Sequence, residues 1–328
     1  MWEVGFAANA AQAQRWNGAS GQHWIEHRER HLAEHQNLTP HLFRRAAIAP
    51  GERVLDVGCG CGDTTILAAR SAGGRSREKS GGSGIAVGLD LSAPMLAVAR
   101  HLAGQAGTAN ARFVRGDAQA RPLRRATFDA VISNFGVMFF GDPRAAFAGL
   151  GAAVRPHGRL VFLCWQDETR NELFNIPLRA FGAHTRLPGP SASGLFFDPG
   201  QITELLSGTG WGDVQVASVN ELAWLGSDVD DVMSYLRGMP MIRALAASLN
   251  NPSLATRVLA TIEEQYQARQ RPDGIWVPAA AWLVTAQRVL FELRLRFGKH
   301  RCVGRCLRVR AWDSTVTQVM PGPSRAPR

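Results

Sequence analysis

Short apolar runs that stop at glycine or polar residues alternate with segments of helical composition in the first half of the chain. Apolar runs of this length, bounded by turn residues, are typical of buried strands. We therefore predict strands at 53–57, 85–89, 111–114, 128–133 and 159–165, and helices at 64–71, 93–103 and 145–154. Strands and helices that alternate at this spacing form βαβ units, so the pattern predicts an α/β fold with a parallel, doubly wound sheet.

The segments on either side of this region follow other patterns. Residues 11–48 have mostly helical composition, interrupted at Asn17-Gly18 and Thr39-Pro40. Further along we predict a loop-rich stretch at 167–199, a helix at 199–207, a strand at 213–219, mostly helical structure at 228–271 and a strand at 275–286. The predicted organisation is an N-terminal helical segment at 1–48, a main domain at 49–286 with capping insertions at about 167–199 and 228–271, and a tail at 287–328.

The formal net charge of +10 is concentrated in the tail. Ten basic and two acidic residues give 287–328 a net charge of +8, so the rest of the chain carries only +2. A nucleic-acid groove needs positive charge on the folded body, and we therefore expect no nucleic-acid partner. A tail that contacts nucleic acid or a membrane surface stays open as an alternative to a loosely ordered, solvated appendage.

Several features argue against secretion and membrane insertion. No apolar run approaches the roughly 20 residues that a membrane span needs, and the first ten residues lack the regions of a signal peptide. Five scattered cysteines do not suggest a disulfide framework. We expect a soluble, cytoplasmic protein, and the sequence leaves its oligomeric state open.

A glycine-rich loop follows the first predicted strand, in the stretch VLDVGCGCG at 54–62. Gly58, Gly60 and Gly62 let a ligand approach the backbone closely, and the following helix offers free N–H groups. The spacing is not the G-x-G-x-x-G of dinucleotide-binding proteins, and the G-K-[ST] of a phosphate-binding Walker loop is absent. Asp56, in the strand just before the loop, suits a ligand with an ammonium or amino-acid group better than a pyrophosphate.

Two further aspartates follow the next predicted strands. Asp90 ends the second strand, where a carboxylate can accept hydrogen bonds from both ribose hydroxyls. Asp117 follows the third strand, where it could accept from an adenine amino group. All three aspartates therefore lie at the carboxyl ends of neighbouring strands, which is where open α/β sheets bind ligands.

These three ordered motifs resemble those of the class I S-adenosylmethionine (SAM) methyltransferases, most closely the small-molecule branch that includes the quinone-biosynthesis C-methyltransferases. The resemblance implies a Rossmann-like, seven-stranded, mainly parallel sheet that ends in an antiparallel hairpin, formed here by 213–219 and 275–286. It implies SAM as the cofactor, with the glycine loop under the methionine part and Asp90 on the ribose. Leu91 and Met95 would lie near the adenosine, and Asp117 and Ala118 at the adenine. Asn134 and Phe135 would lie beside the transferable methyl group. It also implies that the helices at 1–48 form a lid over the cofactor and substrate.

A histidine-rich stretch, HWIEHRERHLAEH at 23–35, contains the order H-x-x-E-H twice. On a helix this order could hold zinc as in the inverted zincins, but no third ligand is apparent downstream, so we expect no metal site. The resemblance makes this stretch part of the lid. His27 and His31 are the candidate general bases, because the pKa of an imidazole suits proton transfer, although we favour a packing role for them.

The remaining candidates concern the cysteines and the methyl acceptor. Cys59 and Cys61 are interpreted as small buried residues, and Cys302 and Cys306 with His300 lack a fourth metal ligand. Apolar residues at 135–140, together with several tryptophans, predict an aromatic or lipophilic small-molecule acceptor. The alternatives are a nicotinamide-dependent oxidoreductase, which the glycine spacing disfavours, a SAM-binding protein without activity, and a zinc hydrolase.

Overall fold

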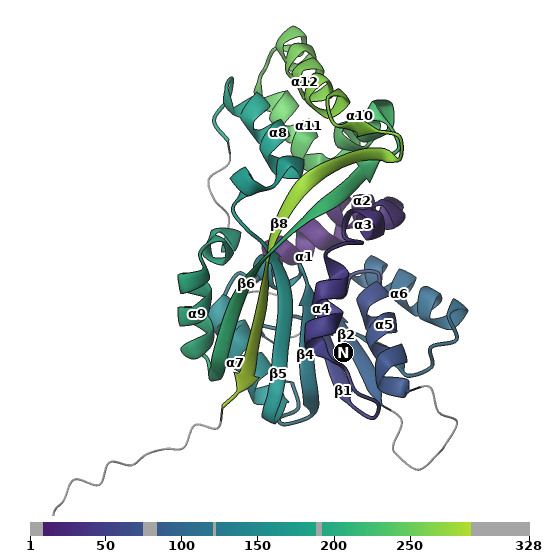
Figure 1. The fold of residues 1–328 in the computed structure, drawn as a ribbon, viewed down its shortest axis with the longest axis vertical. Coiled ribbons are helices and arrows are strands. Elements are labelled where there is room, and N and C mark those ends of the chain that lie inside the picture. The colour runs from purple at the N-terminus through teal and green to yellow at the C-terminus, as the bar shows by residue number, and fades with distance from the viewer. Residues whose placement is uncertain (1–8, 75–83, 121–122, 188–191, 290–328) are drawn as a thin grey trace, which may run out of the picture. The chain divides into compact units, whose positions relative to one another are not determined.

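The computed structural model describes residues 9–74, 84–120, 123–187 and 192–289 (Figure 1). The chain divides into two units, 1–291 and 292–328, and the described residues all belong to the first. The predictions about the first eight residues, about most of the loop at 72–84, about the basic tail and about Cys302 and Cys306 concern parts of the chain outside the described residues. Within the described residues, no helix is long and apolar enough to cross a membrane.

The centre of the fold is one sheet with the strand order β3-β2-β1-β4-β5-β8-β6. The strands are β1 (Arg53–Val57), β2 (Ile85–Asp90), β3 (Ala111–Arg115), β4 (Phe128–Asn134), β5 (Val154–Trp165), β6 (Trp211–Gly226), β7 (Gln270–Arg271) and β8 (Gly274–Arg288). The strands β1 to β5 pair in parallel, and β8 pairs antiparallel with both β5 and β6. The predicted seven-stranded, mainly parallel sheet is confirmed, with the two-residue β7 as a short addition beside β8.

Strand β1 lies in the middle of the sheet because its side chains are aliphatic on both faces. Val54, Leu55 and Val57 are at most 2% exposed, as expected for a parallel strand covered on both sides. Its neighbours are β2 and β4, so the strand order changes direction beside it. Ligands bind in open α/β sheets at such a switch point, outside the carboxyl ends of the strands.

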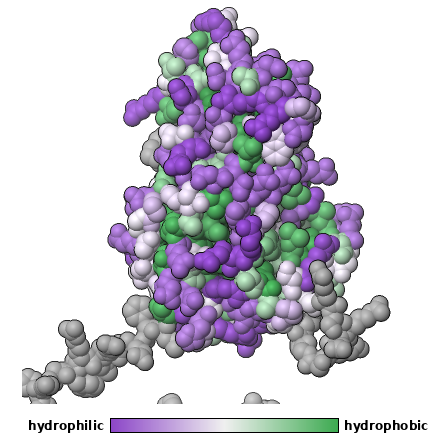
Figure 2. Space-filling model, viewed as in Figure 1, coloured by the Kyte–Doolittle hydropathy of each residue, from purple (hydrophilic) through white to green (hydrophobic). Residues whose placement is uncertain are grey.

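Helices cover the sheet and connect its parallel strands. They are α5 (Asp63–Gly73), α6 (Ala93–Gln105), α7 (Pro143–Ala153) and α9 (Pro199–Ser207). Helix α5 packs against β1 and β2, α6 against β3, α7 against β5, and α9 against β6. On the face seen in Figure 2, hydrophobic residues gather mainly over this lower, sheet-containing part, whereas polar residues predominate above it.

The hairpin of β6 and β8 is longer than predicted and carries a cap. Strand β5 pairs with β8 only from Ala281 to Gln287, but β6 continues to pair with β8 as far as Gly226 and Ile275. Figure 1 shows the helices α8, α10, α11 and α12 around the far end of this hairpin. The prediction that the first of these strands ends at 219 was therefore wrong, because buried residues still alternate with partly exposed ones from Leu222 to Leu225.

The described part of the cap contains four α-helices, and three of them lie in the stretch predicted to be mostly helical. They are α8 (Glu172–Gly182), α10 (Val229–Gly238), α11 (Pro240–Ser248) and α12 (Pro252–Gln267). The helical stretch predicted at 228–271 is interrupted before Pro240 and Pro252, since proline is favoured in the first helical turn and cannot continue a preceding helix. The loop-rich interpretation of 167–199 was wrong for α8, which buries Leu173, Ile176 and Phe181.

The described residues of the N-terminal segment form four helices, α1 (Ala10–Asn17), α2 (Ala19–Glu26), α3 (Arg28–Glu34) and α4 (Thr39–Ala46). The predicted interruptions at Asn17-Gly18 and Thr39-Pro40 are confirmed. The histidine-rich stretch is not one helix, because His27 leaves helical geometry with φ −109° and ψ 23° between α2 and α3. In Figure 1, α1 to α3 lie between the cap and the upper, carboxyl ends of the parallel strands.

Candidate functional site

The glycine loop lies directly on the segment that follows β4. Gly58, Gly60 and Gly62 all have positive φ, at 68°, 51° and 85°, a region that residues with a Cβ atom rarely adopt. A Cβ atom on Gly58 would lie 2.8 Å from the Cα of Gly136. The close approach of these two backbones therefore requires glycine in the loop, and it brings the carboxyl ends of β1 and β4 together.

Asp56 is fully buried beneath this loop. One carboxylate oxygen, Oδ2, accepts hydrogen bonds from the hydroxyls of Thr64 (2.7 Å) and Thr65 (2.6 Å) on α5. The other oxygen, Oδ1, is buried without a partner among the described residues. Burial raises the pKa of Asp56 to about 6 although both hydroxyl bonds favour the charged form. The site thus contains a buried carboxylate oxygen that an ammonium group could satisfy.

Asp90 connects the loop to the end of β2. Its Oδ2 accepts from the backbone N–H of Gly60 at 2.8 Å, and its Oδ1 accepts from that of Ser92 at 2.8 Å. Burial raises the pKa of Asp90, and these backbone hydrogen bonds oppose the rise. The next helix, α6, begins here, with the Ser92 hydroxyl accepting from the N–H of Met95. Asp90 therefore fixes the loop while two lone pairs of its carboxylate stay available for a ligand.

Asp117 and Ala118, at the end of β3, are 4% and 7% exposed. Asp117 accepts hydrogen bonds through Oδ1 from both the backbone and the side-chain amide of Gln119, at 2.9 and 3.1 Å. An adenine amino group would have to share this carboxylate with Gln119 or displace its side chain. No pattern in the sequence had indicated this local partner.

The segment after β4 holds Phe135 in an uncommon conformation. Phe135 has φ 61°, and its ring stacks on Trp165 at 4.1 Å and on His35 at 4.7 Å between centroids. A non-glycine residue in this region costs of the order of 1 kcal/mol and is concentrated at functional sites. Beside it, Asn134 donates to Thr39 at 3.3 Å while its Oδ1 is buried with no partner in the described part of the chain.

The N-terminal helices close over the loop through contacts that sequence reasoning missed. The indole nitrogen of Trp24 lies 3.9 Å from the position that a Cβ of Gly60 would take. Arg28 forms a two-pronged ion pair with Asp63, in which its Nε donates to Oδ2 at 3.0 Å. These contacts join α2 and α3 to the glycine loop and to the first turn of α5.

Helix α1 is joined to the loop after β2 in a similar way. Asn17 donates through Nδ2 to the carbonyl of Leu91 at 3.2 Å, and its Oδ1 accepts from the N–H of Ala93 at 3.0 Å. The Ser92 hydroxyl donates to the carbonyl of Trp16 at 2.8 Å. The loop that carries Asp90 and Leu91 is therefore bound to the N-terminal helices on its outer side.

His31 and His35 lie on either side of Glu34 in the interior. The three residues are 7%, 7% and 5% exposed. His31 stacks on Trp24 at 3.7 Å, and it is the more enclosed of the two candidate bases. Glu34 had no role in the sequence-based prediction, because the H-x-x-E-H pattern drew attention to it only as part of a metal motif.

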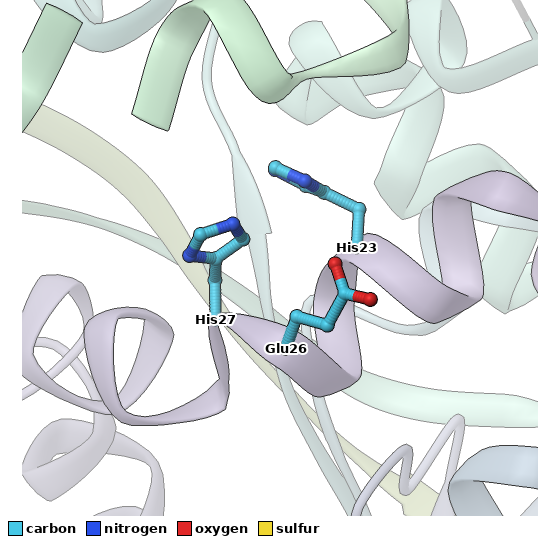
Figure 3. Close-up of side chains that lie close together, drawn as sticks. All are labelled: His23, Glu26 and His27. Carbon is cyan, nitrogen blue, oxygen red and sulfur yellow. The ribbon is translucent and has the colours of Figure 1, made fainter. Parts of the chain in front are cut away.

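The other candidate base, His27, belongs to a second group with His23 and Glu26 near the end of α2. Figure 3 shows the three side chains on one side of the helix end, and one potential ligand atom from each lies within 4.8 Å of the others. Burial lowers the pKa of His23 to about 4 and also lowers that of His27. Both rings pack against Tyr235 of α10, at 5.2 and 4.9 Å. The group is thus a contact between the N-terminal helices and the cap, as well as the candidate for the zinc alternative.

The cysteines of the glycine loop are buried and unpaired. Cys59 and Cys61 are 6% and 3% exposed, and neither forms a disulfide. Burial raises the pKa of both thiols, that of Cys61 to about 12, so they are not reactive thiolates at neutral pH. Their interpretation as small buried residues is confirmed.

Comparison with known proteins gives a consistent result for the region around this site. Residues 54–158 match the family described as "Methyltransferase domain". A demethylmenaquinone methyltransferase of Shouchella clausii is 31% identical over 132 residues, which is 40% of this chain and 53% of that protein. An enzyme of the same name from Thermus thermophilus is 37% identical over 112 residues, covering 34% and 46% of the two chains. An uncharacterized protein of Mycobacterium tuberculosis is 36% identical over 131 residues, covering 40% and 43%.

The matched part of the chain thus spans about half the length of these relatives. Among solved structures, the YcgJ protein of Bacillus subtilis superimposes with a TM-score of 0.50 at 17% identity, over 78% of this chain and 99% of that one. This likeness confirms the predicted fold class. The family match covers the glycine loop and the two aspartate-bearing strand ends, and it identifies residues 54–158 as a methyltransferase domain, as the resemblance to the class I SAM-dependent methyltransferases implied.

Proposed function

We propose that this protein transfers a methyl group from SAM to a small aromatic or lipophilic acceptor. The observation that carries the proposal is the buried Oδ1 of Asp56, which has no partner in the described part of the chain and lies beneath the glycine loop at the switch point of the sheet. An orphaned carboxylate oxygen in the interior is costly unless a ligand satisfies it. The ammonium group of the methionine part of SAM has the matching charge.

The other cofactor contacts are proposed on the same basis. Glycines 58, 60 and 62 would pass under the methionine part, and Asp90 would accept from the ribose hydroxyls with its remaining lone pairs. The other proposed cofactor contacts are Leu91 and Met95 at the adenosine, Asp117 and Ala118 at the adenine, and Asn134 and Phe135 near the methyl group. The bound sulfonium supplies an activated methyl group, so the protein has to align donor and acceptor and exclude water.

The chemical class of the acceptor is proposed from the aromatic side chains that pack around Phe135. Phe135 stacks on Trp165, and Phe174 of the cap meets Trp165 edge to face at 5.6 Å. Flat, apolar acceptors are bound well by such rings. Two of the relatives named above are called demethylmenaquinone methyltransferases, which supports an aromatic acceptor of the quinone or phenol type. The proposal includes a cytoplasmic location, which cell fractionation tests.

The cofactor is tested by calorimetric titration with S-adenosylhomocysteine. We expect one-to-one binding to the wild type, no binding of NADH, and an affinity about 10- to 100-fold lower for Asp90→Ala, because hydrogen bonds to a charged group are lost. Asp230→Ala is the matched control, since Asp230 is exposed on α10. A folded wild-type protein that does not bind S-adenosylhomocysteine would overturn the proposal, and NADH binding would favour the oxidoreductase alternative.

Turnover requires a second experiment with the same protein. A panel of hydroquinones, phenols and small polar amines is incubated with SAM labelled in the methyl group. Transfer to the aromatic members is the expected result, whereas transfer only to the polar amines would contradict the proposed acceptor class. Binding of S-adenosylhomocysteine without transfer to any acceptor would favour a SAM-binding protein without activity.

A further inference from the structure

A carboxylate and two imidazoles form a buried polar group among aromatic side chains near the proposed cofactor site. The carboxylate oxygens of Glu34 lie 3.4 Å from Nδ1 of His31 and 3.4 Å from Nε2 of His35. We call these three residues the His31–Glu34–His35 triad. Their surroundings are largely aromatic, so the charge of this group has to be balanced from within.

Glu34 is ionised in this environment. Burial alone would raise the pKa of Glu34, but the charge of His35 and hydrogen bonds from both imidazoles lower it to about 2. A carboxylate can only accept hydrogen bonds, so each imidazole has to direct an N–H toward it. In its neutral form, His31 then carries its proton on Nδ1 and leaves Nε2 as a proton acceptor. That Nε2 atom is buried and has no hydrogen-bond partner among the described residues.

The triad lies between Trp24, which is close to the glycine loop, and Phe135, which is proposed to lie near the transferable methyl group. At one end, the His31 ring stacks on Trp24, whose indole nitrogen lies over Gly60. At the other end, the His35 ring stacks on Phe135, next to the segment that contacts the glycine loop. An acceptor that entered beside the His31 ring would meet an imidazole nitrogen that has no partner among the described residues and is supported by a carboxylate, which is the arrangement of a general base with its orienting group.

We propose that His31 removes a proton from the acceptor, that Glu34 and His35 position and stabilise it for that task, and that the acceptor therefore carries an ionisable aromatic hydroxyl group. This inference rests on the proposed methyltransferase function and specifies its substrate class. His27, the other candidate base, is assigned to the contact with the cap instead.

The proposed step is balanced without a further reactant. The phenolic O–H bond breaks, its proton moves to Nε2 of His31, and its electron pair remains on the oxygen. The new bond forms between the methyl carbon and either that oxygen or a ring carbon ortho to the hydroxyl group. The C–S bond breaks and its electron pair stays on sulfur. If the ortho carbon is methylated, it then loses its C–H proton, and the ring regains aromaticity as a phenolate that takes back the proton held by His31. In either case one proton passes to water.

Other ionisable groups face the triad from the elements packed around it. Burial raises the pKa of Tyr235 on α10 and of Tyr266 on α12 well above the neutral range, and the charge of Glu34 contributes to both shifts. These phenols therefore stay uncharged at neutral pH. His23 and His27 also lie close enough to His31 for their charges to interact. Within the described residues, the charged groups around these two histidines and two tyrosines include Glu26, Arg30, Glu172, Asp231 and Arg269.

The test uses 4-nitrophenol, whose ionised form absorbs visible light, with the full-length protein saturated with S-adenosylhomocysteine. We expect the bound probe to be phenolate at a mildly acidic pH at which free 4-nitrophenol is mostly protonated. In Glu34→Gln and His31→Gln, the affinity for the phenolate form should fall about 10- to 100-fold, because a charge-assisted hydrogen bond is lost. The affinity for S-adenosylhomocysteine should stay within about twofold, since the triad is placed on the acceptor side.

A second histidine–glutamate pair serves as the control. Nε2 of His41 lies 2.7 Å from Oε1 of Glu221, away from the triad and partly exposed. His41→Gln should therefore leave the ionisation of the bound probe unchanged. Thermal unfolding of all variants identifies any that fail to fold, and His31→Gln gives the answer if Glu34→Gln does not fold.

Two results would overturn the inference. One is that the wild type, with S-adenosylhomocysteine bound, takes up 4-nitrophenol only as the neutral phenol or does not bind it. The other is that the phenolate binds equally well to the wild type and to folded triad variants. Failure of the proposed function is a different result, since S-adenosylhomocysteine itself would then not bind.

Discussion

Replacing Asp56 with asparagine should make the protein more stable and weaken cofactor binding. The folded protein raises the pKa of this carboxyl group from 3.8 to about 6, chiefly by burial. Above about 6 the carboxylate is ionised in both the folded and the unfolded chain, and its burial opposes folding. Between 3.8 and about 6 only the unfolded chain loses the proton, so the penalty develops as the pH rises through this window. Below 3.8 the penalty is absent.

The size of the effect follows from the shift in pKa. Each pH unit corresponds to about 1.4 kcal/mol, so the rise from 3.8 to about 6 corresponds to a penalty of up to about 3 kcal/mol at neutral pH. The amide oxygen of the introduced asparagine can still accept from Thr64 and Thr65, and its NH₂ takes the place of an oxygen that already lacks a partner. Asp56→Asn should therefore raise the free energy of unfolding above pH 6 by as much as about 3 kcal/mol, and raise Tm by several degrees.

The assay combines thermal unfolding on both sides of this window with titration of S-adenosylhomocysteine. The gain in Tm should be present at neutral pH and disappear below pH 3.8, while the affinity for S-adenosylhomocysteine falls about 10- to 100-fold as a charge-assisted contact is lost. Asp230→Asn, at an exposed position, should change neither quantity. Equal or lower stability of Asp56→Asn at neutral pH would refute the reasoning about burial, and unchanged affinity would refute the proposed contact with the ammonium group.

Two further predictions concern the glycine loop and the metal alternative. Gly136→Ala should lower the free energy of unfolding by about 1–3 kcal/mol, since its Cβ would lie within 3 Å of the backbone of β1 and its loop. Gly104→Ala, which meets nothing within 4 Å in the last turn of α6, should be neutral or gain up to about 1 kcal/mol. Equal Tm shifts in the two variants would contradict the close backbone approach. The purified protein should contain much less than one equivalent of zinc, because the charge of Arg30 lies close to His27. Stoichiometric zinc that is lost in His23→Ala would show the opposite.

The sequence predicted the sheet because the features that define it are local. The aliphatic run of β1 and the glycines that follow it lie within ten residues of one another, and Asp90 and Asp117 stand at the ends of their own strands. Positive φ at the loop glycines is likewise a property of single residues. Patterns of this kind can be read without knowing what packs against them.

The packing of the N-terminal helices and of the cap depends on contacts between residues far apart in the chain. The histidine-rich segment breaks at His27, where no glycine or proline marks the end of α2, and the ring of His27 instead packs on Tyr235 of the cap. Arg28 forms its ion pair with Asp63, which is 35 residues away in the chain. Such contacts are tertiary, and they override the helical pattern of the segment in which they occur.

The role of Glu34 could not be predicted for a related reason. In the sequence, an acid between two histidines suggests a metal motif, and only burial separates that interpretation from an internal ion pair. The first H-x-x-E-H stretch, with Glu26, lies at a partly exposed helix end, whereas the second is enclosed. The same pattern therefore has two structural outcomes within thirteen residues.

The hydrogen bonds between α1 and the loop after β2 have a consequence for steady-state kinetics. Asn17 and the carbonyl of Trp16 hold the loop that carries Asp90. A nucleoside that enters or leaves past this loop has to wait until α1 detaches. An acceptor bound against the N-terminal helices would keep α1 in place. Turnover should then follow a compulsory order, with SAM bound first and S-adenosylhomocysteine released last, and excess acceptor should slow the reaction by trapping the spent nucleoside.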